Sequence, residues 1–205
     1  FCLSRGLGDV YKRQVLAWHP SELTGADYMS TMAMVSVRFT FHGRASHAAV
    51  DPHRGRSALD AVELMNVGSN YMREHVKDDA RIHYVITDGG VQPNVVPPRA
   101  SVWYYIRAHA HRDVESYFAW ITKIAEGAAL MTETTFDRKI DTDAHELIPN
   151  AVLAAAIDRN LRTIGPPTFD DADRTFAARI RESIPDAPDG SPLSEEIEPV
   201  PTTPR

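Results

Sequence analysis

The order in which hydrophobic periodicity changes along the chain constrains its fold most strongly. Between residues 34 and 140 the pattern runs strand, helix, strand, strand, helix, strand. The six segments lie at about residues 34–43, 57–76, 82–88, 102–107, 113–128 and 134–140. This order predicts an α+β fold with a ferredoxin-like β-α-β-β-α-β arrangement, in which two helices cover one face of an antiparallel sheet.

Each segment carries local signals of its own. The first alternates hydrophobic with polar residues and ends at Gly43, as expected of a half-buried strand; its hydrophobic residues are Val35, Val37, Phe39 and Phe41. Ser57, with Asp60 three residues later, is a predicted cap of the first helix. Asp113 is the predicted cap of the second. The last predicted strand covers residues 134–140.

The loop after the first strand presents a histidine among small residues. His47 is flanked by Ala45, Ser46, Ala48 and Ala49, which leave its imidazole open to a partner. A histidine placed in this way suits a general acid, an electrophile or a metal ligand. The alternative from spacing alone is an ordinary loop histidine bonded to the backbone.

Several unlike motifs in this region occur in an order that resembles one known family. The motifs are His42-Gly43-Arg44-Ala45-Ser46-His47-Ala48-Ala49, Pro52-His53, Gly55-Arg56-Ser57-Ala58-Leu59-Asp60-Ala61, Pro93-Asn94-Val95-Val96-Pro97 and Arg107. Together they resemble the lid domain of M20-type metallopeptidases, in the branch of aminobenzoyl-glutamate hydrolases. The resemblance covers roughly residues 15 to 180.

This resemblance implies an enzyme. The family hydrolyses amide bonds with one or two divalent metal ions, Zn or Mn, which polarise the carbonyl and lower the pKa of bound water. The implied substrate is an N-acyl or N-aroyl amino acid, with aminobenzoyl-glutamate as the first candidate. His19, in Trp18-His19-Pro20, matches a metal-ligating histidine just before the lid. The alternative for His19 is an ordinary histidine at a strand end.

The resemblance also assigns roles within the lid and implies a homodimer formed through it. His47 matches the histidine that crosses the dimer interface and donates to the substrate carbonyl oxygen in the partner's active site. Asn94 and Arg107 match residues that bind the substrate's free carboxylate. The alternatives are a turn residue for Asn94 and a salt bridge on the sheet face for Arg107.

The resemblance predicts how the chain is divided. Residues 1–14 resemble translated sequencing-adapter sequence and are set aside as non-native. Residues 34–145 are the predicted lid, inserted between pieces of a catalytic domain at 15–33 and at 146–183, where helices are expected. Residues 184–205, rich in proline and acid, are a predicted loop or tail. Such a chain is expected to be a fragment of the enzyme and inactive by itself.

Composition bears on which partners and which cellular compartment are expected. The formal net charge is −6 and the basic residues are scattered, which argues against a nucleic-acid partner. No hydrophobic run approaches the roughly 20 residues of a membrane span, so the default expectation is a cytoplasmic protein without membrane contact. The alternative function is a stand-alone module for dimerisation or small-ligand binding, because this fold hosts many functions.

Overall fold

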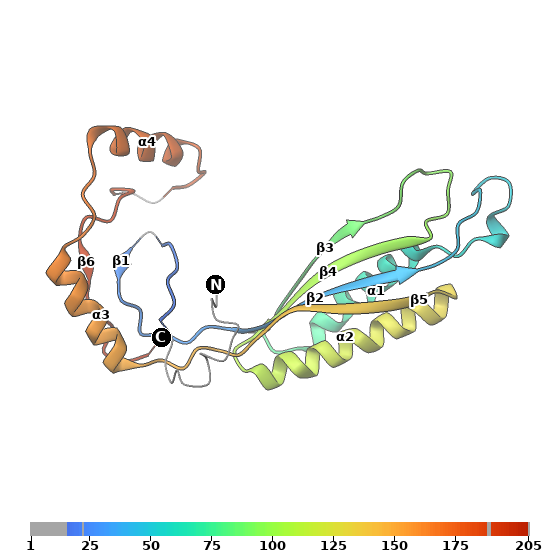
Figure 1. The fold of residues 1–205 in the computed structure, drawn as a ribbon, viewed down its shortest axis with the longest axis horizontal. Helices are drawn as coiled ribbons and strands as arrows, with labels where there is room; N and C mark the ends of the chain where they lie inside the picture. The colour runs from blue at the N-terminus through green and yellow to red at the C-terminus, as the bar shows by residue number, and fades with distance from the viewer. Residues whose placement is uncertain (1–15, 22, 188–189, 205) are drawn as a thin grey trace, which may run out of the picture. The chain divides into compact units, whose positions relative to one another are not determined.

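The protein is described by a computed structural model that covers residues 16–21, 23–187 and 190–204 (Figure 1). The predicted non-native segment 1–14 lies outside these residues. The described chain forms two compact units. One is the continuous stretch Met29–Ile148, and the other combines residues up to 28 with residues from 149 onward.

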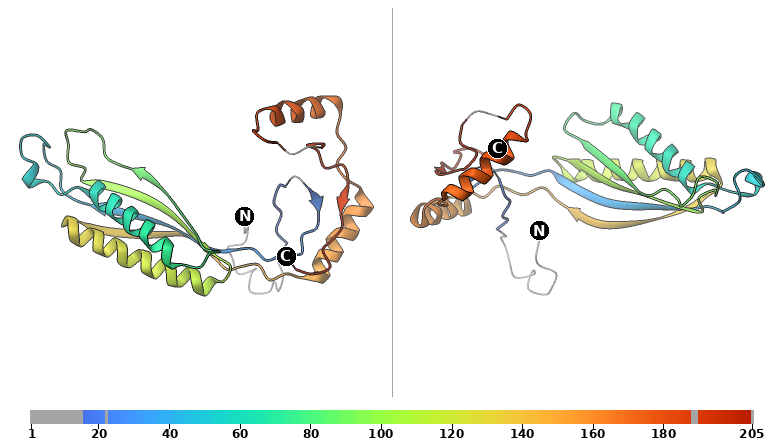
Figure 2. Two further views of the ribbon diagram at one scale, coloured as in Figure 1. Left: turned by 180° about the vertical axis from the view of Figure 1, so that it is seen from behind. Right: turned by 90° about the horizontal axis from the view of Figure 1, so that it is seen from above.

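The unit Met29–Ile148 is a four-stranded antiparallel sheet with two long helices. Its strands are β2 (Ala33–His42), β3 (Arg81–Asp88), β4 (Arg99–Ala108) and β5 (Thr135–Ala144), in the spatial order β3-β4-β2-β5. The helices are α1 (Ala58–Met72) and α2 (His111–Thr132). Figure 2, seen from behind, shows both helices against the same face of the sheet. The predicted order of strands and helices is confirmed.

The core lies between the helices and the two central strands. In β2, Val35, Val37, Phe39 and Phe41 are buried, which confirms the predicted strand face. In β4, Val102, Tyr104 and Ile106 are fully buried beside them. The Tyr104 hydroxyl donates a hydrogen bond of 2.6 Å to Asn66 Oδ1 on α1 and lies 3.2 Å from Ser69 Oγ, so this buried polar group is satisfied. Burial raises the pKa of the Tyr104 hydroxyl.

One predicted helix cap is confirmed and the other is wrong. Ser57 Oγ accepts the Asp60 N–H at 3.1 Å and begins α1. Asp113 does not begin α2, because the helix already starts at His111 and Asp113 lies in its first turn. There it accepts a hydrogen bond of 2.7 Å from Lys77 Nζ. The His111 N–H is capped instead by the carboxylate of Glu146, at 3.1 Å.

The two edge strands are less buried than their sequences suggest. In β3, Ile82 is buried, but Tyr84 is only half-buried and Ile86 is exposed. The alternation of these three hydrophobic residues therefore buries only one of them, because an edge strand has a neighbour on one side only. β5 extends beyond the predicted 134–140 and reaches Ala144 through a bulge opposite Ser36 and Val37.

The sheet has two ends, which we call the tip and the base (Figure 1). The tip comprises residues 42–57 and 91–98, the loops beyond the end of β2 and the start of β4. The base comprises residues 29–33, 107–111 and 143–148, where the chain enters and leaves this unit.

The second unit is smaller in its regular structure. Helices α3 (Ala151–Ile164) and α4 (Asp171–Glu182) agree with the helices expected there, and Asn150 and Asp170 cap them. The predicted tail is not entirely irregular, because β6 (Ile197–Glu198) pairs in parallel with β1 (Thr24–Gly25). A backbone pairing of this kind leaves no pattern in so short a sequence. Across the described residues, no helix is long and apolar enough to span a membrane.

Candidate functional site

Two loops of the tip pair through their backbones and bring His47 and Asn94 together. The Ala48 N–H donates to the Asn94 carbonyl at 2.9 Å, and the Val96 N–H donates to the Ser46 carbonyl at 3.0 Å. An antiparallel bridge joins His47 to Val95 between these bonds. The loop that carries His47 therefore behaves as a short strand whose partner is the loop that carries Asn94.

Two glycines allow this close packing. A Cβ on Gly55 would lie 2.5 Å from Ser46 Oγ and 2.9 Å from the Val96 methyl groups. A Cβ on Gly43 would lie 2.0 Å from the Arg56 carbonyl oxygen. All these distances are far below van der Waals contact, so the tip is packed too closely to accept a side chain at either position.

The hydrogen bonding of His47 determines which ring nitrogen carries its proton. The Ala49 N–H donates to His47 Nδ1 at 3.2 Å, so Nδ1 acts as an acceptor. In the neutral imidazole the proton then resides on Nε2. The side chain is exposed, so its Nε2–H is a donor open to a ligand. The backbone contact therefore fixes the tautomer and leaves the opposite nitrogen free.

Asn94 occupies a turn, as one of its two interpretations predicts. The Val95 N–H donates to the Gln92 carbonyl at 3.2 Å and closes the turn around Asn94. Its side chain is exposed, and within the described chain the amide makes no hydrogen bond. The turn and a ligand-binding role are compatible, because only the Asn94 carbonyl is used by the fold.

Arg107 lies at the base, on the sheet face that the helices leave open. Neighbouring Val102, Tyr104 and Ile106 point into the core, and Arg107 points away from it. Its guanidinium carbon lies 5.4 Å from the centre of the Tyr105 ring. Its Nε is buried without a hydrogen-bond partner, and no carboxylate among the described residues pairs with it. The salt bridge considered as its alternative is therefore not formed there.

Tip and base are far apart within one sheet. His42 pairs with Arg99 at the tip end of β4, and Arg107 lies eight residues further along the same strand. At about 3.3 Å per residue this amounts to roughly 25 Å, and His47 lies beyond the strand end. A single small substrate cannot contact His47 and Arg107 of the same sheet.

His19 belongs to the other unit. It is exposed, and its Nδ1 donates to the Pro20 carbonyl at 2.7 Å, which leaves Nε2 with a lone pair. A histidine that binds a metal commonly has this second hydrogen bond. However, no group of three or more His, Cys, Asp or Glu side chains in the described ranges is placed to hold a metal ion. Among the described residues, His19 is therefore a candidate for one metal ligand, and no complete metal centre is formed.

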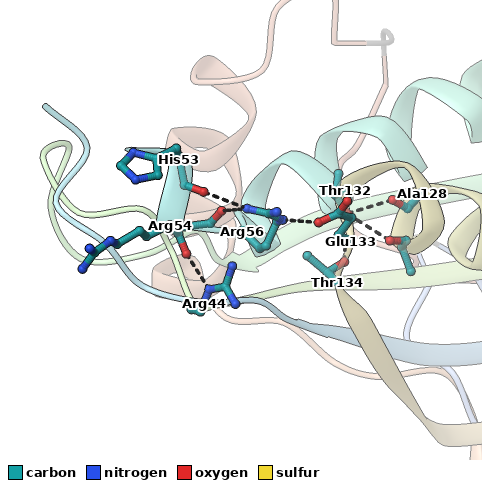
Figure 3. Close-up of polar contacts among 10 residues, drawn as sticks. Arg44, His53, Arg54, Arg56, Ala128, Thr132, Glu133 and Thr134 are labelled. Carbon is teal, nitrogen blue, oxygen red and sulfur yellow. Dashed lines mark hydrogen bonds and ion pairs between the residues drawn. The ribbon is translucent and has the colours of Figure 1, made fainter. Parts of the chain in front are cut away.

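Three arginines at the tip form contacts that the sequence analysis did not predict (Figure 3). Arg44 Nε donates to the Arg54 carbonyl at 2.5 Å, and Arg56 Nε pairs with Glu133 at 2.5 Å. Arg56 also donates to the carbonyls of His53 and Gly55, at 3.2 and 2.6 Å. The sequence does contain a signal for this group, because three arginines lie within thirteen residues of a chain with net negative charge.

Comparison with known proteins identifies a matching family and relatives. The model of the family described as peptidase dimerisation domain matches residues 30–132. One of the subunits of the p-aminobenzoyl-glutamate hydrolase of Escherichia coli strain K12 is 43% identical over 170 residues, which are 82% of this chain and 35% of that protein. The Xaa-Arg dipeptidase of Mus musculus is 36% identical over 154 residues, 72% of this chain and 34% of the dipeptidase. The chain thus spans about a third of the length of these relatives.

Solved structures share the fold at lower identity. The aminobenzoyl-glutamate utilization protein of Klebsiella pneumoniae aligns with a TM-score of 0.56 and 21% identity, over 78% of this chain and 43% of the other. An amidase of the hydantoinase/carbamoylase family from Burkholderia vietnamiensis aligns with a TM-score of 0.58 and 15% identity, over 69% and 34%. At these identities the similarity concerns the fold alone.

Proposed function

Because the chain belongs to the M20 family through its peptidase dimerisation domain, we propose that it forms the lid and part of the catalytic domain of a metal-dependent amidohydrolase. The reaction is hydrolysis of the amide bond between an acyl or aroyl group and an amino acid. Aminobenzoyl-glutamate is the first candidate substrate, since one chain of a p-aminobenzoyl-glutamate hydrolase is 43% identical. The observation that carries the proposal is the exposed Nε2–H donor of His47 on a rigid tip.

In this proposal His47 stabilises the negative charge that develops on the substrate carbonyl oxygen. A neutral imidazole with its proton on Nε2 donates one hydrogen bond in the required direction. The paired backbones of the two tip loops hold the ring in place, so little reorganisation is needed as the charge forms. A donor of this kind lowers the activation free energy by roughly 3 kcal/mol.

Arg107 and Asn94 are proposed to bind the free carboxylate of the substrate. The unpaired Nε of Arg107 and the planar guanidinium suit a carboxylate, and the Asn94 amide adds a neutral donor. Because tip and base are roughly 25 Å apart, these two residues of one chain serve different active sites. In this proposal Arg107 contributes to the active site of its own chain, whereas His47 and Asn94 contribute to the partner's site.

The proposed homodimer pairs the β3 edge of one lid with that of another. β5 carries five charged residues in ten, which oppose edge pairing, whereas the centre of β3, residues 83–87, has no Asp, Glu, Lys or Arg. Helix α1 borders the β3 edge, since Arg73 just after α1 donates to the Ile82 carbonyl at 2.7 Å. The outer face of α1 exposes an apolar stripe at helical spacing, formed by Leu64, Val67 and Tyr71.

Antiparallel pairing of β3 with its copy would bring tip and base together. Arg81 lies at the base end of β3 and Asp88 at the tip end. In an antiparallel pair related by a twofold axis, the Asp88 end of one strand meets the Arg81 end of the other. The tip of each lid therefore lies on the same side as the base of its partner. This arrangement supports a site built from Arg107 of one chain and His47 of the other.

His19 is proposed as one ligand of the divalent metal, Zn or Mn, through its Nε2. When bound, such an ion polarises an amide carbonyl and activates water. The remaining ligands would come from outside the described residues, so we assign no step of the reaction through the metal. Residues 15–33 and 146–183 are proposed to belong to that catalytic domain, and 34–145 to the lid.

The proposal also includes the arrangement of strands and helices in the lid and the cellular compartment of the enzyme. The strand order β3-β4-β2-β5, with both helices on one face, supports a ferredoxin-like arrangement. We propose a cytoplasmic enzyme that acts on small N-acyl amino acids, without nucleic acid or membrane as a partner.

The proposal is tested by assaying the complete polypeptide that carries this sequence. With Zn or Mn supplied, it should release p-aminobenzoate from aminobenzoyl-glutamate and lose activity on chelation. The 205-residue chain by itself should show no metal-dependent hydrolysis, because its described residues contain no group of three metal ligands. If the complete polypeptide forms a dimer and hydrolyses no N-acyl amino acid, the alternative of a dimerisation or binding module is favoured.

A further inference from the structure

The tip concentrates positive charge in a chain that is negative as a whole. Residues 42–57 contain three arginines and a single acid, Asp51, while the whole chain carries a formal charge of −6. The three arginines do not play equivalent parts. Two of them hold the backbone of the turn Pro52–Arg54, and the third is held by it.

Arg44 and Arg56 brace this turn through its carbonyl groups. Arg44 binds the Arg54 carbonyl, and Arg56 binds those of His53 and Gly55. Glu133, which ends α2 with a left-handed φ of 52°, fixes Arg56 from the other side. Three consecutive carbonyls are thus held by side chains from outside the turn. Such support fixes the direction of any side chain that the turn carries.

Arg54 is the side chain that this turn presents. It is exposed, and its guanidinium makes no hydrogen bond or ion pair with any described residue. Figure 3 shows it extending away from the rest of the tip, whereas Arg56 lies toward Glu133. The result is a free guanidinium on a braced backbone.

Arg54 stays close to His47 through two consecutive turns. The Asp51 N–H donates to the His47 carbonyl at 3.0 Å, and the Arg54 N–H donates to the Asp51 carbonyl at 3.1 Å. Gly55, the next residue, packs against Ser46 so closely that a Cβ has no space. The segment therefore folds back on itself, and Asp51 ties the backbone of Arg54 to that of His47.

We propose that Arg54 determines specificity by binding a second carboxylate, on the side chain of an acidic N-acyl amino acid held in the active site that His47 serves. This inference rests on the proposed function, because it needs a substrate beside His47. A guanidinium binds a carboxylate through two parallel hydrogen bonds, so it favours glutamate over a neutral residue of the same length. Arg54 is a binding residue here and takes no part in the chemical step.

The test compares two substrates in the complete enzyme. Arg54→Ala should raise KM for p-aminobenzoyl-glutamate about tenfold or more, the loss expected for a hydrogen-bonded charge pair. For p-aminobenzoyl-norvaline, which has a similar length and no second carboxylate, KM should change less than about twofold. Arg54→Lys should restore part of the preference. Arg112→Ala, at an exposed arginine near the base, is the matched control and should alter neither KM.

The outcomes separate this inference from the function beneath it. An equal effect of Arg54→Ala on both substrates, or no effect on either, refutes a role in recognising the second carboxylate. If the unmodified enzyme hydrolyses neither substrate, the proposed function is wrong and the role of Arg54 is rejected with it. A change in kcat with unchanged KM would also contradict a binding role.

Discussion

The tip and the base of the lid are held in shape by different kinds of contact. At the tip, bonds between backbone groups join the two loops and two glycines allow their close packing, while arginine side chains support only the turn that follows His47. At the base, contacts between side chains hold the chain in shape. His111 is buried there, with Nε2 2.6 Å from Asp143 Oδ1 and its ring stacked on His145 at 3.8 Å.

The base also ties the departing chain to α2. Glu146 accepts the His111 N–H, and its pKa lies below the ordinary value. The largest cause is a hydrogen bond from its own backbone N–H, which burial, the second-largest effect, opposes; the bond from His111 and the electrostatic effects of His145 and His111 lower the pKa further. The stability that this carboxylate contributes is therefore fully present above the usual pKa of a glutamate and is lost as the pH falls through the lowered pKa of Glu146.

The difference fits the two positions in the proposed dimer. A tip proposed to enter a partner's active site needs a defined shape of its own, and the backbone bonds between its two loops provide one. The base joins two units of one chain, where side chains from α2, β5 and the connecting segment meet. Each end can thus be altered separately, which allows the comparison to be tested.

The largest effect is expected at the tip. In the complete enzyme, His47→Ala should lower kcat about a hundredfold or more and change KM little, because the lost bond strengthens as the oxyanion forms. Metal content should be unchanged, as measured by elemental analysis, since His47 is no ligand in this proposal. A rise in KM with normal kcat would show that His47 only binds substrate.

Subunit mixing tests whether His47 acts across the dimer. His47→Ala enzyme mixed with a variant that is inactive in its metal site should regain part of the activity. One mixed site then combines an intact metal centre with an intact His47. If labelled subunits exchange and no activity returns, His47 acts within its own chain or is structural.

A smaller effect is expected at the base. Arg107→Ala should raise KM about ten- to a hundredfold for substrates with a free α-carboxylate, the loss of a charge-assisted hydrogen bond. The same substrate as its α-methyl ester should bind variant and unmodified enzyme about equally well. If Arg107→Ala raises KM equally for both substrates, Arg107 supports the sheet face and does not bind the carboxylate.

How far the sequence predicts these features depends on whether they leave a pattern. The buried strand faces at Val37 and Tyr104 follow from alternation, because burial on one side of a strand imposes it. The pairing of the His47 and Asn94 loops does not, because backbone bonds leave no side-chain pattern. The proposed role of Arg54 is also hidden in the sequence, because an arginine whose side chain binds backbone carbonyls, such as Arg44, cannot be told there from one whose side chain is free.

The proposed dimer links tip to base, and an edge substitution tests it. Val85→Lys places a charge at the exposed centre of β3 and should weaken dimerisation about tenfold or more, as measured by sedimentation. Ile140→Lys on β5 is a matched control, because the two side chains are similarly exposed, at 54% and 47%. If Ile140→Lys dissociates the dimer and Val85→Lys does not, the lids pair through β5.

The smallest expected effect comes from two histidine–aspartate contacts of equal length, one at each end. At the tip, His42 Nε2 lies 2.6 Å from Asp137 Oδ2, with both side chains largely exposed; at the base, His111 makes the same contact with Asp143 while its own side chain is only 10% exposed. Asp143→Asn should cost on the order of 1 kcal/mol in the free energy of unfolding, because the amide oxygen still accepts the bond but brings no charge to a buried donor. Asp137→Asn should cost less than about 0.5 kcal/mol, since water replaces an exposed contact. Urea unfolding of both variants measures the difference directly. Equal costs would mean that the base owes its shape to the His111–His145 stack and the Glu146 contact, and that Asp143 adds no more there than Asp137 does at the tip.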